Sequence, residues 1–238
     1  MQSKLLSVAS RKKPLSICMI SDDFLPSATG VGSHLQVVVA ELIKRGNCVS
    51  VITTRRPDQP TFEIWQGVRV YRTKTIKLFG FYQALPSVGD IKKILLEVKP
   101  DRIHFHYLSF LLLRVLKIAK KFGVPTVYTY HMNEVHLTQP WCMRPFRPII
   151  ARKIVNCCNQ FDQIISVSKN LATKLPKSGI KKNITYISNP IIFSDEKLPD
   201  PQKANEEFTV LFAGRLDPEK NVPYLLKAFK KLLIHKPT

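Results

Sequence analysis

Two cations near the end of the chain flank a turn that could bind phosphate. Arg215 and Lys220 follow the apolar run 208–213 and precede a stretch of helical periodicity. Asn221 and Pro223 are typical of a helix start. Charge-assisted hydrogen bonds beside a helix N-terminus suit a diphosphate, each contributing roughly 1.5–3 kcal/mol. We therefore predict a strand, an anion-binding turn and a helix, with a solvated charged turn as the alternative. The apolar stripe of this helix comprises Leu225, Leu226, Phe229, Leu232 and Leu233.

A glycine-containing loop near the N-terminus is the second candidate for ligand binding. The stretch "SDDFLPSATGVGSH", residues 21–34, joins the first predicted strand to the first predicted helix, for which Ser33 is the expected N-cap. Gly30 and Gly32 permit close approach of a ligand, and the helix offers free N–H groups to an anion. The loop is neither a GxGxxG fingerprint nor a Walker loop. Glycines at such turns also serve backbone conformation alone, and both interpretations stay open.

Histidines follow two further predicted strands. "HFHYLSF" places His104 and His106 on one side of a strand, and "YTYHMNEVH" brings His131, Glu134 and His136 after another. Imidazoles two residues apart can chelate an ion, with a third ligand from the neighbouring strand. A polar contact of His131 with a ligand and a hydrogen-bonded core histidine are the alternatives. No aspartate follows closely to complete a common hydrolase cluster, so we expect neither a metal nor a cofactor.

The elements that must position these residues alternate between strand-length apolar runs and helical periodicity. Several runs are continuously apolar, as in parallel strands buried on both faces. The order predicts an α/β fold with a doubly wound, mostly parallel Rossmann-like sheet, in which ligands bind at the carboxyl ends of the strands. A helix is expected from Ser33 to just before Gly46, and another at Phe110–Phe122. The expected strands are Leu15–Ile20, Cys48–Thr53, Arg102–Tyr107, Thr126–Tyr130, Gln163–Val167 and Ile184–Ile187.

Two further features of the sequence are a hairpin pattern and the spacing of the cysteines. "FEIWQGVRVYR", residues 62–72, has two alternating runs around a glycine and predicts a small peripheral hairpin after the second strand. Five cysteines without a CxxC pair predict neither a disulfide framework nor a zinc clip. Cys18 and Cys48 lie in strand-like runs and are expected to be small core residues.

A change of composition after Ser188 predicts a domain boundary. The stretch 189–207 is rich in proline and acidic residues and shows no helical stripe, as expected of a linker. We therefore predict an N-terminal extension (1–14), a Rossmann-like domain (15–188), the linker, and an incomplete second Rossmann-like unit (208–238).

The net charge of +20 indicates attraction to anionic surfaces or ligands. The basic residues are spread along the chain, which is also compatible with a generally basic surface. A nucleic-acid- or membrane-binding module without catalysis is one alternative function, although no helix-turn-helix, zinc finger or RNP element is recognisable. A metal-dependent hydrolase built on His104, His106 and His131 is another.

Some of the cations could contact a membrane. Arg114, Lys117 and Lys121 lie beside the leucine-rich face of the helix expected at 110–122, and Arg144 and Arg147 begin a second cluster. A solvated helix face is the alternative. No apolar stretch approaches the ~20 residues of a membrane span, and the N-terminus lacks the apolar region of a signal peptide. We expect a cytoplasmic protein, with peripheral attachment to the inner face of the plasma membrane as a further expectation.

Together these motifs resemble the retaining glycosyltransferases of family 4, which have the GT-B fold of two facing Rossmann-like domains. "PSATGVGSHLQVVVAELIKRGNCVSVIT" is similar to that family's glycine loop, first helix and second strand. "KPDRIHFHY", "VPTVYTYH", "DQIISVSKNLATKL" and "ITYISNP" match later landmarks in order. "FAGRLDPEKNVPYLLKAF" is similar to the start of the donor-binding domain. Thr29 stands where the family often has a glycine, and Asn47 replaces a usual histidine.

The resemblance implies transfer of a hexose-type sugar, with retention, from a nucleotide-diphosphate sugar to a lipid or cell-envelope glycan acceptor. It implies that Arg215 and Lys220 hold the diphosphate and neutralise the leaving group, and that His131 contacts the transferred sugar. Gly30 and Gly32 lie in the loop that approaches the donor phosphates and acceptor. Such enzymes act by positioning and electrostatic stabilisation, commonly without an essential metal. No nucleic-acid partner is expected.

The resemblance also implies that the donor side is incomplete. Family members carry two glutamates eight residues apart far down the donor domain, whereas no Asp or Glu follows Glu219 here. Residues 15–188 resemble the acceptor-side domain, and 208–238 the start of a donor-binding domain. We therefore expect a truncated chain of doubtful activity alone, or one whose partner chain supplies the rest of the donor domain.

Overall fold

The computed structural model describes residues 13–25, 29–78, 81–106, 108–131, 145–191, 210–214, 216 and 220–235. The chain divides into two compact units, Met1–Ile192 and Phe193–Thr238. The first unit contains an α/β sheet domain, and the second contains the helix α6 (Val222–His235). Most of the predicted extension and most of the predicted linker lie outside the described residues, so the predicted boundaries stay predictions.

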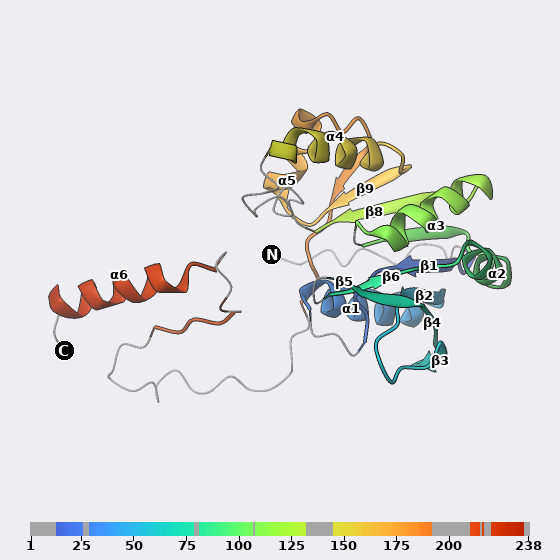
Figure 1. Ribbon diagram of the computed structural model, residues 1–238, viewed down its shortest axis with the longest axis horizontal. Helices are drawn as coiled ribbons and strands as arrows, with labels where there is room; N and C mark the ends of the chain where they lie inside the picture. Colours follow the sequence, from blue (N-terminus) through green and yellow to red (C-terminus); the bar gives the residue numbers. More distant parts are fainter. Residues whose placement is uncertain are drawn as a thin grey trace, which may run out of the picture. The chain divides into compact units, whose positions relative to one another are not determined.

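The main sheet of the first unit has the strand order β10-β9-β8-β7-β1-β2-β4-β3 (Figure 1). Every neighbouring pair is parallel except β3 and β4. The prediction of an α/β fold with a mostly parallel sheet is therefore confirmed. The strands are β1 (Ser16–Ile20), β2 (Cys48–Thr54), β3 (Phe62–Trp65), β4 (Val68–Thr73), β7 (Arg102–Phe105), β8 (Thr126–Tyr130), β9 (Gln163–Ser166) and β10 (Ile184–Tyr186).

Helices cover both faces of this sheet. One face packs against α1 (Gly30–Lys44), through Leu35 and Val39. The other face packs against α2 (Val88–Val98), α3 (Phe110–Lys121) and α4 (Arg147–Cys158) (Figure 1). The short helices α5 (Lys169–Lys174) and η3 (Pro176–Ser178) connect β9 to β10. The predicted helix at 110–122 is confirmed as α3.

The alternation of side chains along the strands produces two cores. Cys18 and Ile20 of β1 belong to the core under α2 and α3, whereas Met19 belongs to the core under α1. Successive side chains of a strand point to opposite faces, so a continuously apolar strand serves both cores. Cys18 is fully buried, as predicted, but Cys48 is exposed at the start of β2, so its prediction as a core residue is wrong.

The predicted hairpin at 62–72 exists, but its peripheral position is wrong. β3 and β4 pair antiparallel, as expected of a hairpin. However, β4 also pairs in parallel with β2 and so extends the main sheet. Val68 and Val70 of β4 are fully buried in the core under α1. Because β4 has a partner strand on each side and packs under α1, it is part of the domain core.

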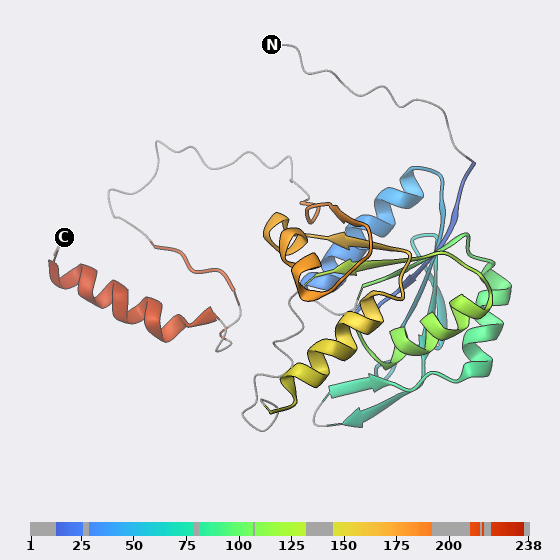
Figure 2. The same cartoon turned by 90° about the horizontal axis from the view of Figure 1, so that it is seen from above.

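A second, two-stranded sheet was not predicted. It consists of β5 (Thr75–Leu78) and β6 (Phe81–Ala84), paired antiparallel. β6 contacts α3, and Figure 2 shows the hairpin beside that helix. This hairpin leads directly into α2, whose N-terminus is capped by the Ser87 hydroxyl.

In the second unit α6 begins at Val222, directly after Asn221, as predicted. The backbone carbonyl of Asn221 accepts hydrogen bonds from the N–H groups of Tyr224 and Leu225. The strand predicted before this helix is not formed by the described residues 210–213. A strand needs a neighbouring strand to bond with, and the described part of this unit contains none.

Candidate functional site

The candidate site lies at the carboxyl ends of the parallel strands, where the winding of the sheet reverses. From β1 the chain first builds β2 and β4 on one side and then β7 to β10 on the other. The crevice between β1 and β7 is therefore the topological switch point, where α/β sheets bind ligands. The N–H of His106, just after β7, donates to the carbonyl of Ile20 in β1 and fixes the two strand ends together.

The loop that follows β1 leads into the N-terminus of α1. The Thr29 hydroxyl accepts a hydrogen bond from the N–H of Gly32 at 3.0 Å, so the helix begins at Gly30. The prediction that Ser33 caps this helix is wrong, since Ser33 lies within its first turn and is exposed. A side chain at Gly30 would meet no atom within 4 Å, whereas Gly32 is buried. Among the described residues, this open space beside the helix N-terminus leaves room for an anionic ligand.

Strand alternation brings three histidines to the face that α1 covers. Ile103 and Phe105 of β7 point into the core under α2 and α3, so His104 and His106 point to the opposite face. Tyr128 and Tyr130 of β8 share that core, which places His131 on the α1 face as well. The helix contributes His34, whose ring lies 4.7 Å from that of His131 between centroids.

His34, His106 and His131 form a compact group, here called the histidine cluster. One ring nitrogen of each lies within 4.8 Å of those of the other two. Nδ1 of His106 and Nε2 of His131 are 3.2 Å apart. By geometry these three nitrogens could hold a metal ion. The metal site considered from the sequence contained His104 in place of His34. In the structure, Nε2 of His104 is hydrogen-bonded to the Thr129 hydroxyl at 2.7 Å.

Burial keeps the histidine cluster neutral at physiological pH. It lowers the pKa of His131 to about 4, with a smaller contribution from the proximity of His34. The pKa of His106 falls well below its ordinary value for the same reason, reinforced by His104, His131 and His34. Burial also lowers the pKa of His34, opposed by a hydrogen bond with Asn189. Neutral imidazoles can donate or accept hydrogen bonds and can bind metals.

A buried carboxyl group, that of Asp22, also lies at the carboxyl end of β1. Burial raises the pKa of Asp22 to about 6, opposed by a hydrogen bond with Ser109 at the start of α3. Its Oδ2 is buried and has no hydrogen-bond partner among the described residues. Asp22 lies in the glycine-containing loop 21–34 but was not among the predicted site residues. The signal available was its position two residues after a strand.

The predicted donor-phosphate residues lie in the second unit. Lys220 is exposed next to the start of α6, and Arg215 lies outside the described residues. Glu134 and His136 also lie outside them. Gly30, Gly32 and His131 are thus the predicted site residues that the described structure places at one edge of the sheet.

A groove with a basic rim lies on the far side of the sheet from α1. Its volume is about 450 Å³, and it runs between α3 and the segment that joins β6 to α2. Leu85, Val88, Phe110 and Leu113 line it and are 44–65% exposed. The cations at this groove are Lys92, Arg114, Lys117 and Lys121.

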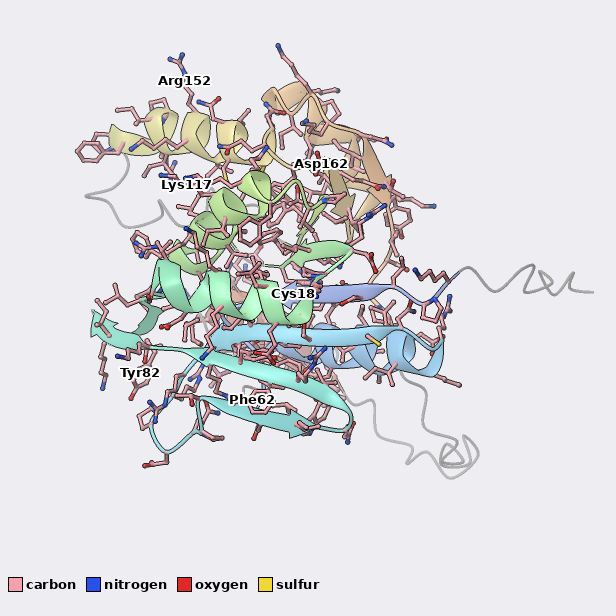
Figure 3. The ribbon with its side chains drawn as sticks, turned by 90° about the vertical axis from the view of Figure 1, so that its right-hand side faces the viewer. Cys18, Phe62, Tyr82, Lys117, Arg152 and Asp162 are labelled. Carbon is pink, nitrogen blue, oxygen red and sulfur yellow. The ribbon has the colours of Figure 1, made fainter. Side chains whose placement is uncertain are left out.

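The predicted membrane-contact residues Arg114, Lys117 and Lys121 therefore share one exposed surface (Figure 3 labels Lys117). The Arg114 guanidinium donates to the carbonyl of Pro86 at 2.8 Å, which ties α3 to the loop before α2. Arg147 is exposed at the start of α4, and Arg144 lies outside the described residues. None of the helices in the described ranges is long and apolar enough to cross a membrane.

Comparison with known proteins identifies the family. The family model for Glycosyltransferase Family 4 matches residues 28–194. The chain is 24% identical to the alpha-monoglucosyldiacylglycerol synthase of Streptococcus pneumoniae, covering 92% of this chain and 53% of the relative. It is 23% identical to a human phosphatidylinositol N-acetylglucosaminyltransferase subunit, covering 90% of this chain and 44% of the relative. The chain thus spans about half the length of these relatives.

A solved structure supports the same fold. The chain resembles Anabaena HepE in complex with UDP and glucose, with a TM-score of 0.51 and 16% identity over 74% of this chain and 45% of that protein. The family match includes Gly30 and Gly32, all three residues of the histidine cluster, and the strands β7 and β8. The chain belongs to glycosyltransferase family 4.

Proposed function

We propose that this chain transfers a sugar, with retention, from a nucleotide-diphosphate sugar to a lipid-type acceptor at an anionic membrane surface. The observation that carries the proposal is the position of neutral His131 at the switch point of a family 4 sheet, on the face covered by α1. A site of this kind positions a sugar and stabilises a departing diphosphate.

Each side chain of the site has a proposed role. Neutral His131 accepts or donates a hydrogen bond at a sugar hydroxyl, since its pKa of about 4 leaves it uncharged at pH 7. The helix N-terminus at Gly30 offers N–H groups to an anionic ligand. The cations Arg215 and Lys220 of the second unit stabilise the negative charge that develops on the leaving diphosphate. These groups need no metal ion, and catalysis is expected to survive a chelator.

The acceptor class is proposed from the basic groove and from the relatives. The name of the Streptococcus pneumoniae relative includes a diacylglycerol product, and that of the human relative a phosphatidylinositol substrate. Apolar side chains surrounded by cations suit a surface of anionic lipids. A lipid acceptor would then be presented at the membrane to which the groove binds.

Assembly with a partner chain is a further part of the proposal. It is supported by the human relative, whose name is that of one subunit of a transferase.

Transfer of labelled sugar tests the proposal. The purified chain, alone and with a candidate partner chain from the same source, is incubated with UDP- and GDP-sugars and with vesicles containing diacylglycerol or a polyprenyl phosphate. Lys220→Ala and Arg215→Ala should lower turnover by about tenfold or more, since one charge-assisted bond contributes roughly 1.5–3 kcal/mol. Lys227→Ala, an exposed lysine of α6, is the matched control and should retain turnover. Equal rates in all three variants would refute the assignment of the donor residues.

A further inference from the structure

We propose that the histidine cluster of His34, His106 and His131 is a binding site for a divalent transition-metal ion that prefers imidazole ligands, such as Zn²⁺. It shares His131 with the site proposed above for sugar transfer, whose chemistry uses no metal. It combines side chains from three elements, namely α1 and the residues that follow β7 and β8.

The spacing of the ring nitrogens fits a tetrahedral ion. Zinc binds histidine nitrogen at about 2.0–2.1 Å, so two nitrogens on one tetrahedral ion lie roughly 3.3–3.4 Å apart. Nδ1 of His106 and Nε2 of His131 already lie 3.2 Å apart. The nitrogen of His34 lies within 4.8 Å of the other two. A rotation of the partly exposed His34 side chain that brings its nitrogen closer to the other two would complete a three-nitrogen site.

Nδ1 of His34 is buried and has no hydrogen-bond partner among the described residues. Nε2 of His106 is unpartnered in the described structure as well, but it is the other ring nitrogen from Nδ1, the one that lies next to His131. His106 itself is 1% exposed. An unsatisfied buried polar atom costs free energy, so such atoms often mark the place of a ligand. A neutral imidazole keeps one ring nitrogen with a lone pair, which can bind a metal.

Three histidines leave the fourth tetrahedral position to water or to a substrate oxygen. A bound ion would occupy His131, and His131 is the residue proposed to contact the transferred sugar. Metal binding should therefore inhibit sugar transfer rather than support it. This consequence rests on the proposed function, whereas metal binding itself does not.

The competing explanation is that the cluster is held by hydrogen bonding alone. The 3.2 Å separation of His106 and His131 is also that of an ordinary hydrogen bond between two imidazoles. The two explanations differ in a measurable way, because hydrogen bonding alone gives no stoichiometric affinity for a metal.

Metal titration of the purified full chain tests the site. Zn²⁺ should bind with one ion per chain, and Co²⁺ should produce the visible absorption of a tetrahedral site. His34→Gln and His131→Gln should each weaken Zn²⁺ binding by more than the ~10–100-fold loss typical of an outer-shell change. His235→Gln, in α6 of the second unit, is the control and should bind as the unchanged chain does.

A thermal melt guards against misfolded variants. Zn²⁺ should raise the midpoint of unfolding of the unchanged chain and of His235→Gln, but not that of His34→Gln. If His131→Gln does not fold, His34→Gln alone decides the result. Unchanged Zn²⁺ affinity in folded His34→Gln, or no stoichiometric binding by the unchanged chain, would overturn the proposal. A chain that binds Zn²⁺ in the titration, yet transfers no sugar in a separate assay without metal and with the candidate partner chain, would support this site and count against the proposed function.

Discussion

The hydroxyl of Thr29 accepts a hydrogen bond from the N–H of Gly32 at 3.0 Å, and this bond sets the start of α1. Family members often have glycine at the position of Thr29. Glycine at this position would give a more flexible backbone, whereas the threonine side chain caps the helix. The cap satisfies one of the N–H groups that have no partner within the helix. The same N-terminus is the one proposed to offer N–H groups to an anionic ligand, so its position matters for stability and, on that proposal, for binding.

Removing this cap should destabilise the domain by a measurable amount. Thr29→Ala should lower the free energy of unfolding by about 1 kcal/mol, whereas Thr29→Gly should cost only roughly a few tenths of a kcal/mol. Ser33→Ala is the matched control, since Ser33 is exposed within the helix and makes no cap. Urea unfolding followed by circular dichroism gives the three values. A Ser33→Ala loss as large as that of Thr29→Ala would show that the helix is capped one turn later than described.

The position of β4 in the main sheet leads to a second prediction. Val70 is fully buried under α1, whereas Ile64 of the neighbouring β3 is 67% exposed. Val70→Ala removes buried methyl groups and should cost about 2 kcal/mol or more. Ile64→Ala should cost under about 1 kcal/mol, because its side chain is largely in water already. Similar losses in urea unfolding for both variants would mean that the hairpin is peripheral after all.

Much of the fold could be predicted because its strands are continuously apolar. Runs such as that of β2 identify parallel strands buried on both faces, and their order in the chain fixes a doubly wound sheet. The role of β4 could not be predicted, because its alternating pattern is that of a hairpin and gives no sign of the parallel partner β2. The hairpin β5–β6 and α2 were missed, although Ser87 followed by amphipathic periodicity was a usable signal.

The candidate site could be predicted in part. Two-residue periodicity places His104 and His106 on one face, and the position of His131 after β8 is clear from the apolar run before it. His34 was missed because the sequence gives no distance between a helix and a strand. Its position four residues before Val38, on the inward side of α1, was the available signal. Only coordinates show that His106 pairs with His131, whereas His104 is hydrogen-bonded elsewhere, to Thr129.

The lowered histidine pKa values predict that the domain is less stable in mild acid. Above pH 6.5 these histidines are neutral whether the chain is folded or unfolded, so they contribute no pH dependence. Below it the unfolded chain takes up protons that folded His104 and His131, with pKa values of about 3 and 4, do not. The unfolded state is therefore favoured increasingly as the pH falls from 6.5 towards 4. Asp22, with its pKa raised to about 6, acts in the opposite direction between pH 6 and 3.8.

Four lowered histidines outweigh one raised carboxyl group, so the net effect is a loss of stability. The free energy of unfolding in urea should be at least about 1 kcal/mol lower at pH 5.5 than at pH 7.5, since one pKa unit corresponds to about 1.4 kcal/mol. His104→Gln should reduce this difference, because it removes one of the titrating groups. Equal stability at the two pH values would contradict the burial of the histidine cluster.

Binding to anionic vesicles should depend on the rim of the groove between α3 and the β6–α2 segment. The double variant Lys117→Glu, Lys121→Glu should weaken binding to phosphatidylglycerol vesicles at low salt by at least about tenfold, since each cation near a membrane contributes about 1 kcal/mol. Arg114 is left unchanged because it bonds the carbonyl of Pro86 and supports the local structure. Lys44→Glu, at the last turn of α1 on the other face of the sheet, is the control and should weaken binding much less. Vesicle sedimentation measures each variant. Equal sedimentation with neutral and anionic vesicles, or an equal loss in the Lys44→Glu control, would show that the groove does not mediate membrane binding.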